Sequence, residues 1–227
     1  MLAGGGLSFL NWAGKVAGAS FAIPVAAALA TRVKQAPLRI IAVYCVLGFL
    51  QSMALSLLSA RGEHNLWLIH LFIPIQATMF LWALALWQTR ERMRITVGMI
   101  VPLYLIVWIA LTIRVESLDT FPRYVKIIEG LLIIAVAAYT LLTRLQHISG
   151  PVTSYPWFWV CSALVMYLSF GAIVNPVSSL LLPHAPDRVS FMSSVNAVLL
   201  IVCNLFFTRA MYAATVRAPA DGAAAAA

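Results

Sequence analysis

The sequence predicts an all-α integral membrane protein, a bundle of seven transmembrane helices with the N-terminus outside and the C-terminus in the cytoplasm. Three observations predict this fold. Hydrophobic residues make up 63% of the 227 residues and charged residues only 10%, whereas soluble domains carry about 25% charged residues. Seven apolar stretches are long enough to cross a bilayer. Basic residues gather in the short turns between these stretches, on one side more than on the other.

The seven stretches predict the elements in chain order. A spanning helix needs about 20 apolar residues, and backbone polar groups at that depth must be satisfied within helices. The first stretch is rich in Ala and Gly and is interrupted by Pro24. Residues 1–213 are predicted to form one transmembrane domain, and residues 214–227 a disordered, low-complexity tail. The predicted spans cover residues 12–31, 38–60, 66–88, 95–115, 123–144, 156–182 and 190–213.

The orientation follows from the basic residues. Nine of the fifteen Lys and Arg residues lie on the odd-numbered connections and the C-terminal segment, and six lie on the other side. The densest basic turn is "TRERMR", residues 89–94, and such turns stay cytoplasmic. The net charge of +8 therefore indicates membrane topology and not a nucleic-acid partner. We expect a multi-pass protein of the cell membrane, in a bacterium the inner membrane, with the lipid bilayer as its first partner.

Ionisable residues inside a span are costly, so each one needs a reason. Glu129 lies seven residues beyond Pro122, which is about 10 Å into the outer leaflet. Lys126 is three residues earlier on the same helical face and can pair with it. Two interpretations stay open: a structural ion pair near the membrane interface, or a carboxylate that faces a wet cavity.

Other polar residues fall in the same half of the membrane. His70 lies one to two turns inside the third span, and Pro74 is expected to bend that span, because it leaves the His70 carbonyl without its helical donor. A cavity open to the outside explains this distribution; the alternative is that helix ends are polar everywhere. The candidate ligand-binding residues are Glu129, Lys126, His70, Gln76, Asn196 and Asn175.

The sequence offers no set of residues for catalysis or for a metal, and it names no cofactor. Glu63, His64, His184 and Asp187 lack the spacing of metal ligands. The seventh span has no lysine for a retinal Schiff base, and Cys45, Cys161 and Cys203 lie inside apolar runs without CxxC spacing. We therefore expect a protein that is not an enzyme.

Short motifs resemble one family. "HN-W" enters the third span, "P-I-Q" lies inside it, "IIEGLL" lies in the fifth, "P-x-FW" opens the sixth, and the seventh contains an asparagine. Between residues 37 and 212 the chain resembles an uncharacterised family of small heptahelical bacterial membrane proteins, some related to the membrane modules of sensor kinases. The resemblance implies a seven-helix fold. Relatives usually carry Glu where this chain has Gln76, which puts a charged role at that position in doubt.

The resulting hypothesis is a receptor-like or sensory module that binds a small or amphipathic ligand from the outer side and signals through a separate cytoplasmic partner. A small transporter is the alternative, since "AIPVAAALATR" and "IIAVAAYTLLTR" are each followed by a basic turn and a Pro-started span. That pattern predicts two parallel repeats in a 3+1+3 arrangement. The third possibility is a non-catalytic accessory subunit that contacts other membrane protein subunits.

Overall fold

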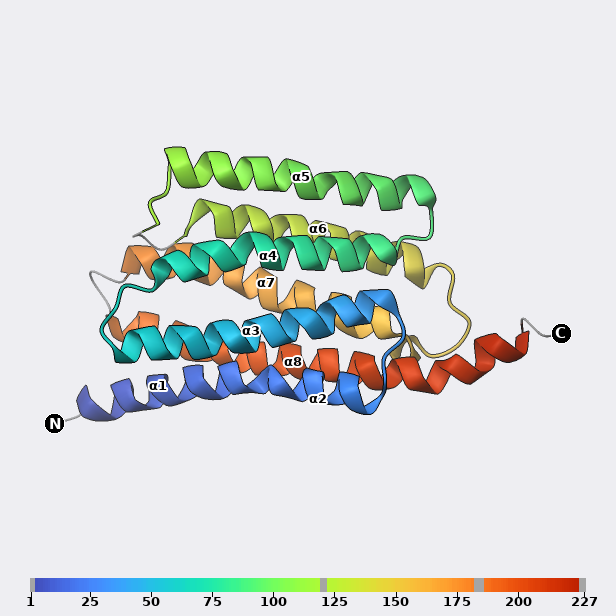
Figure 1. The fold of residues 1–227 in the computed structure, drawn as a ribbon, viewed down its shortest axis with the longest axis horizontal. Coiled ribbons are helices and arrows are strands. Elements are labelled where there is room, and N and C mark those ends of the chain that lie inside the picture. The colour runs from blue at the N-terminus through green and yellow to red at the C-terminus, as the bar shows by residue number, and fades with distance from the viewer. Residues whose placement is uncertain (1–2, 119–121, 182–185, 225–227) are drawn as a thin grey trace.

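The protein is all-helical in the part of the chain that the computed structural model describes, residues 3–118, 122–181 and 186–224 (Figure 1). Seven helices in this part are long and apolar enough to cross a membrane. An all-α bundle with seven potential spans is therefore confirmed. The helices are α1 (Ala3–Ser20), α2 (Ala22–Ala30), α3 (Ala36–Ala60), α4 (Leu66–Leu86), α5 (Glu91–Arg114), α6 (Tyr124–Leu145), α7 (Pro156–Leu181) and α8 (Pro186–Ala224), with a 3₁₀ turn, η1 (Val152–Ser154), before α7.

The first span consists of two helices, α1 and α2, which are separated at Phe21. Pro24 has no N–H to donate to the carbonyl of Ser20, four residues earlier, so the helix is interrupted where proline removes a hydrogen bond. The interruption that Pro24 predicts in the first span is therefore confirmed.

Several helices extend beyond the predicted spans, among them α1, which begins at Ala3 and not at residue 12. α5 begins at Glu91 and not at residue 95, because the helix extends through the basic turn. α8 continues to Ala224, beyond residue 213, where the sequence predicts the low-complexity tail to begin. The domain boundary at that point stays a prediction.

The helix ends form two opposite faces of the bundle (Figure 1). The face that carries the α3–α4 loop, residues 61–65, is called the His64 end; α4, α6 and α8 begin there. The face that carries the α4–α5 loop, residues 87–90, is called the Arg90 end; α3, α5 and α7 begin there. The two names carry no statement about which face is cytoplasmic.

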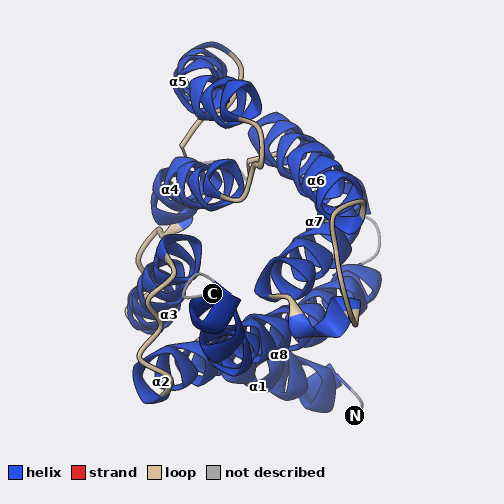
Figure 2. Ribbon diagram, turned by 90° about the vertical axis from the view of Figure 1, so that its right-hand side faces the viewer, coloured by secondary structure: helices blue, strands red, loops and turns tan. Residues whose placement is uncertain are grey.

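Within the described chain, six spans form a closed ring and the fourth span, α5, lies outside it (Figure 2). Around the ring, α1 and α2 pack on α3, α3 on α4, α4 on α6, α6 on α7, α7 on α8, and α8 on α1 and α2. α5 packs against α4 and α6. The ring therefore closes between the third and fifth spans.

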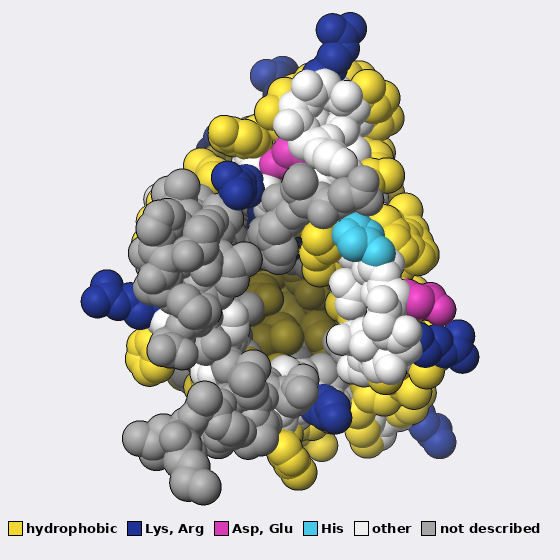
Figure 3. Space-filling model, turned by 90° about the vertical axis from the view of Figure 1, so that its left-hand side faces the viewer, with side chains coloured by type: hydrophobic (Ala, Val, Ile, Leu, Met, Phe, Trp, Pro, Cys, Tyr) yellow, Lys and Arg dark blue, Asp and Glu magenta, His cyan; other side chains and the backbone are white. Residues whose placement is uncertain are grey.

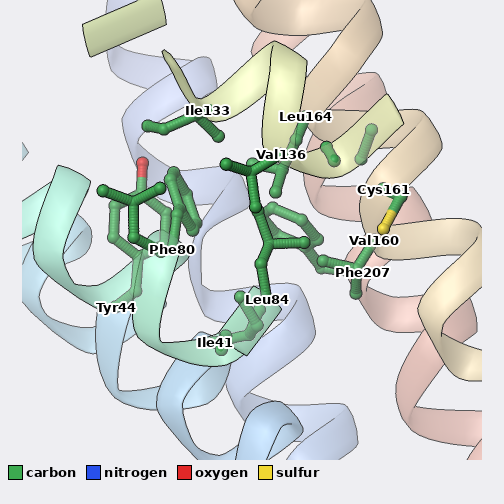
Figure 4. Close-up of a cluster of buried hydrophobic side chains, with 14 of the residues drawn as sticks. Ile41, Tyr44, Phe80, Leu84, Ile133, Val136, Val160, Cys161, Leu164 and Phe207 are labelled. Carbon is green, nitrogen blue, oxygen red and sulfur yellow. The ribbon is translucent and has the colours of Figure 1, made fainter. Parts of the chain in front are cut away.

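Aromatic and aliphatic side chains from the ring helices pack together inside the ring (Figure 4). The rings of Tyr44 on α3 and Phe80 on α4 lie 4.4 Å apart between centroids, and Phe207 on α8 lies 6.2 Å from Phe80. Such tilted ring pairs are favourable beyond the area they bury. Further buried side chains from the ring helices surround them: Ile41, Leu84, Ile133, Val136, Val160, Cys161 and Leu164.

The outer surface of the bundle suits a lipid environment. On α5, large apolar side chains point away from the ring and are exposed: Ile95, Met99, Leu103, Ile106, Ile109 and Ile113. A water-soluble protein rarely exposes a continuous apolar patch of this kind. The polar groups that need explanation are therefore those inside the bundle.

Candidate functional site

The Lys126–Glu129 ion pair is the centre of the candidate site. The Lys126 Nζ donates to Glu129 Oε2 at 2.8 Å. The Glu129 side chain is fully buried, while that of Lys126 keeps 20% of its surface exposed. The other carboxylate oxygen, Oε1, has no hydrogen-bond partner among the described residues. The pairing expected from the three-residue spacing is confirmed, and it leaves one acceptor of the buried carboxylate unused.

A small cavity lies beside this pair, between α4, α6, α7 and α8. Its volume is about 160 Å³. Lys126 and Gly130, one helical turn apart on α6, form one wall of the cavity. The other lining residues are Ile69, Pro122, Tyr167, Leu168, Gly171, Ala172 and Asn196. Figure 3 looks onto the His64 end and shows it hollowed, with hydrophobic side chains at the floor.

Two further polar side chains reach the cavity from other helices. Asn196 on α8 and Tyr167 on α7 both line the cavity, and their side chains lie near enough to interact. The cavity thus brings together an ammonium, a phenol and a carboxamide from three helices. Asn196 was among the sequence candidates, but Tyr167 was not. The sequence gives no separate signal for Tyr167, because its hydroxyl is one of several in the sixth predicted span.

Small residues make room for the cavity. A Cβ atom at Gly130 would lie 3.7 Å from the Ala172 Cβ and 3.7 Å from the Leu168 carbonyl oxygen, an ordinary van der Waals distance. A methyl group fits there and takes up part of the space beside Lys126. The substitution Gly130→Ala therefore reduces the volume of the cavity without disturbing the helices around it.

The remaining sequence candidates lie elsewhere. His70 is fully buried on α4, next in the chain to the cavity residue Ile69. Gln76 is buried six residues further along α4, and its Nε2 has no partner among the described residues. Asn175 belongs to α7, but its side chain lies outside the described part of the structure. The structure thus groups Lys126, Glu129 and Asn196, and leaves Gln76 deeper in the bundle.

Pro74 lies inside α4, as expected, and His70 faces the interior of the protein. The His70 side chain is therefore turned away from the outer surface of the bundle. The predicted bend of α4 at Pro74 stays a prediction. In either case the proline ring cannot donate to the His70 carbonyl.

At the Arg90 end, α4 and α6 are joined by polar contacts. Gln88 Nε2 donates to Thr140 Oγ1 at 2.8 Å and to the Leu84 carbonyl at 3.0 Å. Arg144 Nε donates to the Trp87 carbonyl at 2.7 Å. The end of α6 opposite the cavity is therefore tied to the end of α4.

A second polar contact joins the first and last spans. Asn204 Nδ2 on α8 donates to Ser20 Oγ at 2.7 Å, and the Ser20 hydroxyl donates to the Ala17 carbonyl at 2.6 Å. Interhelical hydrogen bonds of this kind hold membrane helices together. Asn204 is fully buried, so this contact fixes the helix interface and does not border the cavity.

Within the described residues, His, Cys, Asp and Glu side chains form no group of three or more that could hold a metal ion. His184 and Asp187, two of the residues considered for such a site, have side chains outside the described part.

Comparison of the chain with protein-family models, with curated proteins and with solved structures found no match. The resemblance to small heptahelical bacterial membrane proteins therefore stays a prediction.

Proposed function

We propose that this chain is a receptor-like or sensory seven-helix membrane module that binds a small ligand in the cavity between α4, α6, α7 and α8. The observation that carries the proposal is the convergence of Lys126, Tyr167 and Asn196, from three helices, on one small cavity. A cavity with a few convergent polar groups and apolar walls is the usual form of a small-molecule site. The proposed role is binding, and it needs no catalytic group.

The lining indicates the kind of ligand. A volume of about 160 Å³ is close to that of an engineered protein cavity of about 150 Å³ that binds benzene. Lys126 and Asn196 supply hydrogen-bond donors, and Ile69 and Leu168 supply apolar contacts. A small amphipathic molecule with an acceptor group, such as an aromatic or short-chain carboxylate, matches both features.

The proposal places the His64 end outside and the Arg90 end in the cytoplasm of a bacterial cell. The basic turn at residues 89–94 lies at the Arg90 end, and such turns are retained on the cytoplasmic side. A ligand that enters the cavity contacts α6 near its beginning, and the far end of α6 is tied to α4 through Gln88 and Arg144. A separate cytoplasmic partner is proposed to respond to changes in this contact between α4 and α6.

A thermal-unfolding experiment tests the proposal. Benzoate and short-chain carboxylates are added to the purified protein, and unfolding is followed with a thiol-reactive dye, because Cys45, Cys161 and Cys203 are buried in the folded state. We expect a carboxylate to raise the unfolding temperature of the wild type and of the control Gly98→Ala, whose added Cβ meets no atom within 4 Å. Gly130→Ala, which narrows the cavity, and Lys126→Met are expected to reduce the shift. An equal shift in Gly98→Ala and Gly130→Ala would contradict binding in this cavity.

The order of helices in the ring favours a small transporter as the second candidate. The first three and the last three spans follow one another around the ring, and α5 lies outside, as a linker helix would in a 3+1+3 arrangement. The core residues Tyr44, Phe80 and Phe207 lie nearer the Arg90 end by their positions along α3, α4 and α8, which favours one-sided binding. Vesicles with the purified protein distinguish the two: a receptor binds labelled benzoate without accumulating it, whereas a transporter moves it into the lumen.

A further inference from the structure

A second opening in the bundle lies between α1 and α3, in the half nearest the His64 end. α1 begins at this end and α3 ends there, so the two helices are antiparallel. Gly14 and Gly18, four residues apart, share one face of α1. A Cβ atom at Gly18 would lie 2.8 Å from the Ser52 Cβ, whereas one at Gly14 would have no atom within 4 Å. The helices therefore touch at Gly18 and separate toward the His64 end.

The space between the separated helices consists of two hollows. The inner hollow has a volume of about 520 Å³ and reaches Ile69 on α4. The outer groove has a volume of about 570 Å³ and runs along α3 on the opposite side. The residues that line both are Gly14, Lys15, Ser52, Ser56 and Ala60. Because these shared residues come from α1 and α3, the two hollows meet in the gap between these helices.

The inner hollow is polar, whereas the outer groove is mostly apolar. Besides Lys15, the polar side chains that line the inner hollow are those of Ser52, Ser56, Ser59 and Asn65. The large apolar side chains that line the outer groove are those of Phe49, Met53 and Leu57. Met53 and Leu57 are more than half exposed, so this side of α3 faces hydrocarbon when the bundle lies in a bilayer. The pair of hollows therefore suits a molecule with a polar head and an apolar chain.

Lys15 lies where the two hollows meet and has no counter-charge. Its side chain forms no ion pair or hydrogen bond with any residue that the structure describes. Lys15 follows the start of the first candidate span, at Trp12, by three residues, or about 5 Å along the helix axis. A lysine near the end of a span keeps its ammonium group at the level of the lipid head groups. Lys15 is therefore placed to meet an anionic head group.

The contact between α1 and α3 orders the lining residues by depth. Lys15 lies almost one turn before Gly18, and Ser56 lies one turn after Ser52, so the lysine and this serine are at a similar level in the antiparallel pair. The outer groove follows α3 from Phe49 to Ala60. These eleven residue steps span about 16 Å, close to half of a hydrocarbon core about 30 Å thick. The groove thus has the length of one leaflet, with its polar residues toward the membrane surface.

We propose that an anionic phospholipid binds between α1 and α3. Its phosphate lies at Lys15 and Ser56 in the inner hollow, and one acyl chain lies in the outer groove along Phe49 and Met53. Basic pockets between transmembrane helices bind anionic head groups, and serine hydroxyls donate hydrogen bonds to phosphate oxygens. The other acyl chain stays in the bilayer. A soluble phosphate would gain the polar contacts alone, so the apolar groove is the feature that favours a lipid.

The lipid site is separate from the proposed ligand cavity. Ile69 borders both the inner hollow and that cavity, so a bound head group lies beside it. None of the polar residues of the cavity lines either hollow. The lipid site therefore does not rest on the receptor-like function proposed above.

Native mass spectrometry of the delipidated protein in detergent tests the lipid site. Phosphatidylglycerol and phosphatidylcholine with the same acyl chains are titrated separately, and the wild type is expected to retain more phosphatidylglycerol. Lys15→Met should lower the affinity for phosphatidylglycerol about fivefold, equivalent to about 1 kcal/mol for one basic residue near the membrane surface. The affinity for phosphatidylcholine should not change.

Lys34→Met is the matched control. It removes the same charge from an exposed lysine in the α2–α3 loop, at the Arg90 end, and should bind both lipids as the wild type does. Gly130→Ala, which narrows the ligand cavity, should do the same. Equal retention of phosphatidylglycerol by wild type, Lys15→Met and Lys34→Met would overturn the head-group site. A loss in Gly130→Ala equal to that in Lys15→Met would place the lipid in the ligand cavity and overturn the proposal.

Gly14→Leu tests the gap itself, because its side chain enters the open space beside α3. It is expected to reduce the retention of both lipids. Folding is checked by the low reactivity of the three buried cysteines with a thiol dye, and the exposed substitution Lys15→Met decides the question if Gly14→Leu does not fold. Full retention by folded Gly14→Leu would overturn binding in the gap. Displacement of phosphatidylglycerol by glycerol 3-phosphate would show a site for a soluble anion and overturn the assignment to a lipid.

Discussion

The cost of leaving one buried charge without a partner determines how substitutions of Lys126 and Glu129 change the stability of the fold. Glu129 is fully buried and its one described ionic partner is Lys126 at 2.8 Å. Removing one member of a buried pair leaves an uncompensated charge, whereas replacing both members with apolar side chains is often tolerated. The pair should therefore respond very differently to one substitution and to two.

We predict that Lys126→Met lowers the free energy of unfolding by about 3–5 kcal/mol. The double substitution Lys126→Met with Glu129→Leu should recover most of that loss. Denaturant unfolding, followed by the reaction of the three buried cysteines with a thiol dye, measures both. Arg94 and Glu91 provide the control, because they form an ion pair with the same three-residue spacing on α5 but are exposed. Arg94→Met should change stability by less than about 1 kcal/mol; an effect as large as that of Lys126→Met would contradict the role of burial.

At the level of residues, the sequence predicts the ion pair but not the whole cavity. The spacing of Lys126 and Glu129 within one helix is sufficient to predict their contact, since residues three apart share a face. Tyr167 and Asn196 lie on different helices, and their meeting depends on how α7 and α8 pack. No local pattern contains that information.

At the level of helices, close approach of α1 and α3 depends on small residues. A Cβ atom at Gly18 would lie 2.8 Å from the Ser52 Cβ, closer than two such atoms normally come. Gly14, one turn earlier on α1, has no atom within 4 Å of the same position. Small residues four apart are a common feature of membrane helix contacts, but here only one of the two makes the contact.

We therefore predict that Gly18→Ala pushes α1 away from α3 and lowers the free energy of unfolding by about 1–3 kcal/mol, the usual cost of overpacking. Gly14→Ala should leave it nearly unchanged or raise it slightly, because alanine is the better helix former. The thiol-reactivity assay measures both variants under the same conditions. A loss of stability in Gly14→Ala equal to that in Gly18→Ala would show that helix propensity, and not the α1–α3 contact, sets the response.

The number of spans and their approximate positions follow from the sequence, because membrane thickness sets the length of each apolar run. Their order around the ring does not. α5 carries exposed apolar residues such as Met99 and Leu103 on one side and Tyr104 and Trp108 on the other, yet apolar runs of this kind look alike along all seven spans. The position of α5 outside the ring is a property of the packing of the whole chain, and it brings α4 and α6 together beside the cavity.

For the whole molecule, the orientation in the membrane decides from which side the cavity is reached. The basic turn at residues 89–94 lies at the end opposite the cavity. Basic residues in short turns are retained in the cytoplasm at much higher frequency than they are exported. This asymmetry predicts that a thiol introduced in the basic turn is inaccessible from outside the cell.

Thr89 and Glu63 allow a matched test, because both are exposed and they lie in turns at opposite ends of the bundle. In intact cells, a membrane-impermeant maleimide should label Glu63→Cys and not Thr89→Cys. After the membrane is permeabilised, both should react. The three native cysteines are buried, so the introduced thiol dominates the signal. Labelling of Thr89→Cys alone in intact cells would show that the orientation is the opposite one. The cavity at the His64 end would then bind its ligand from the cytoplasm.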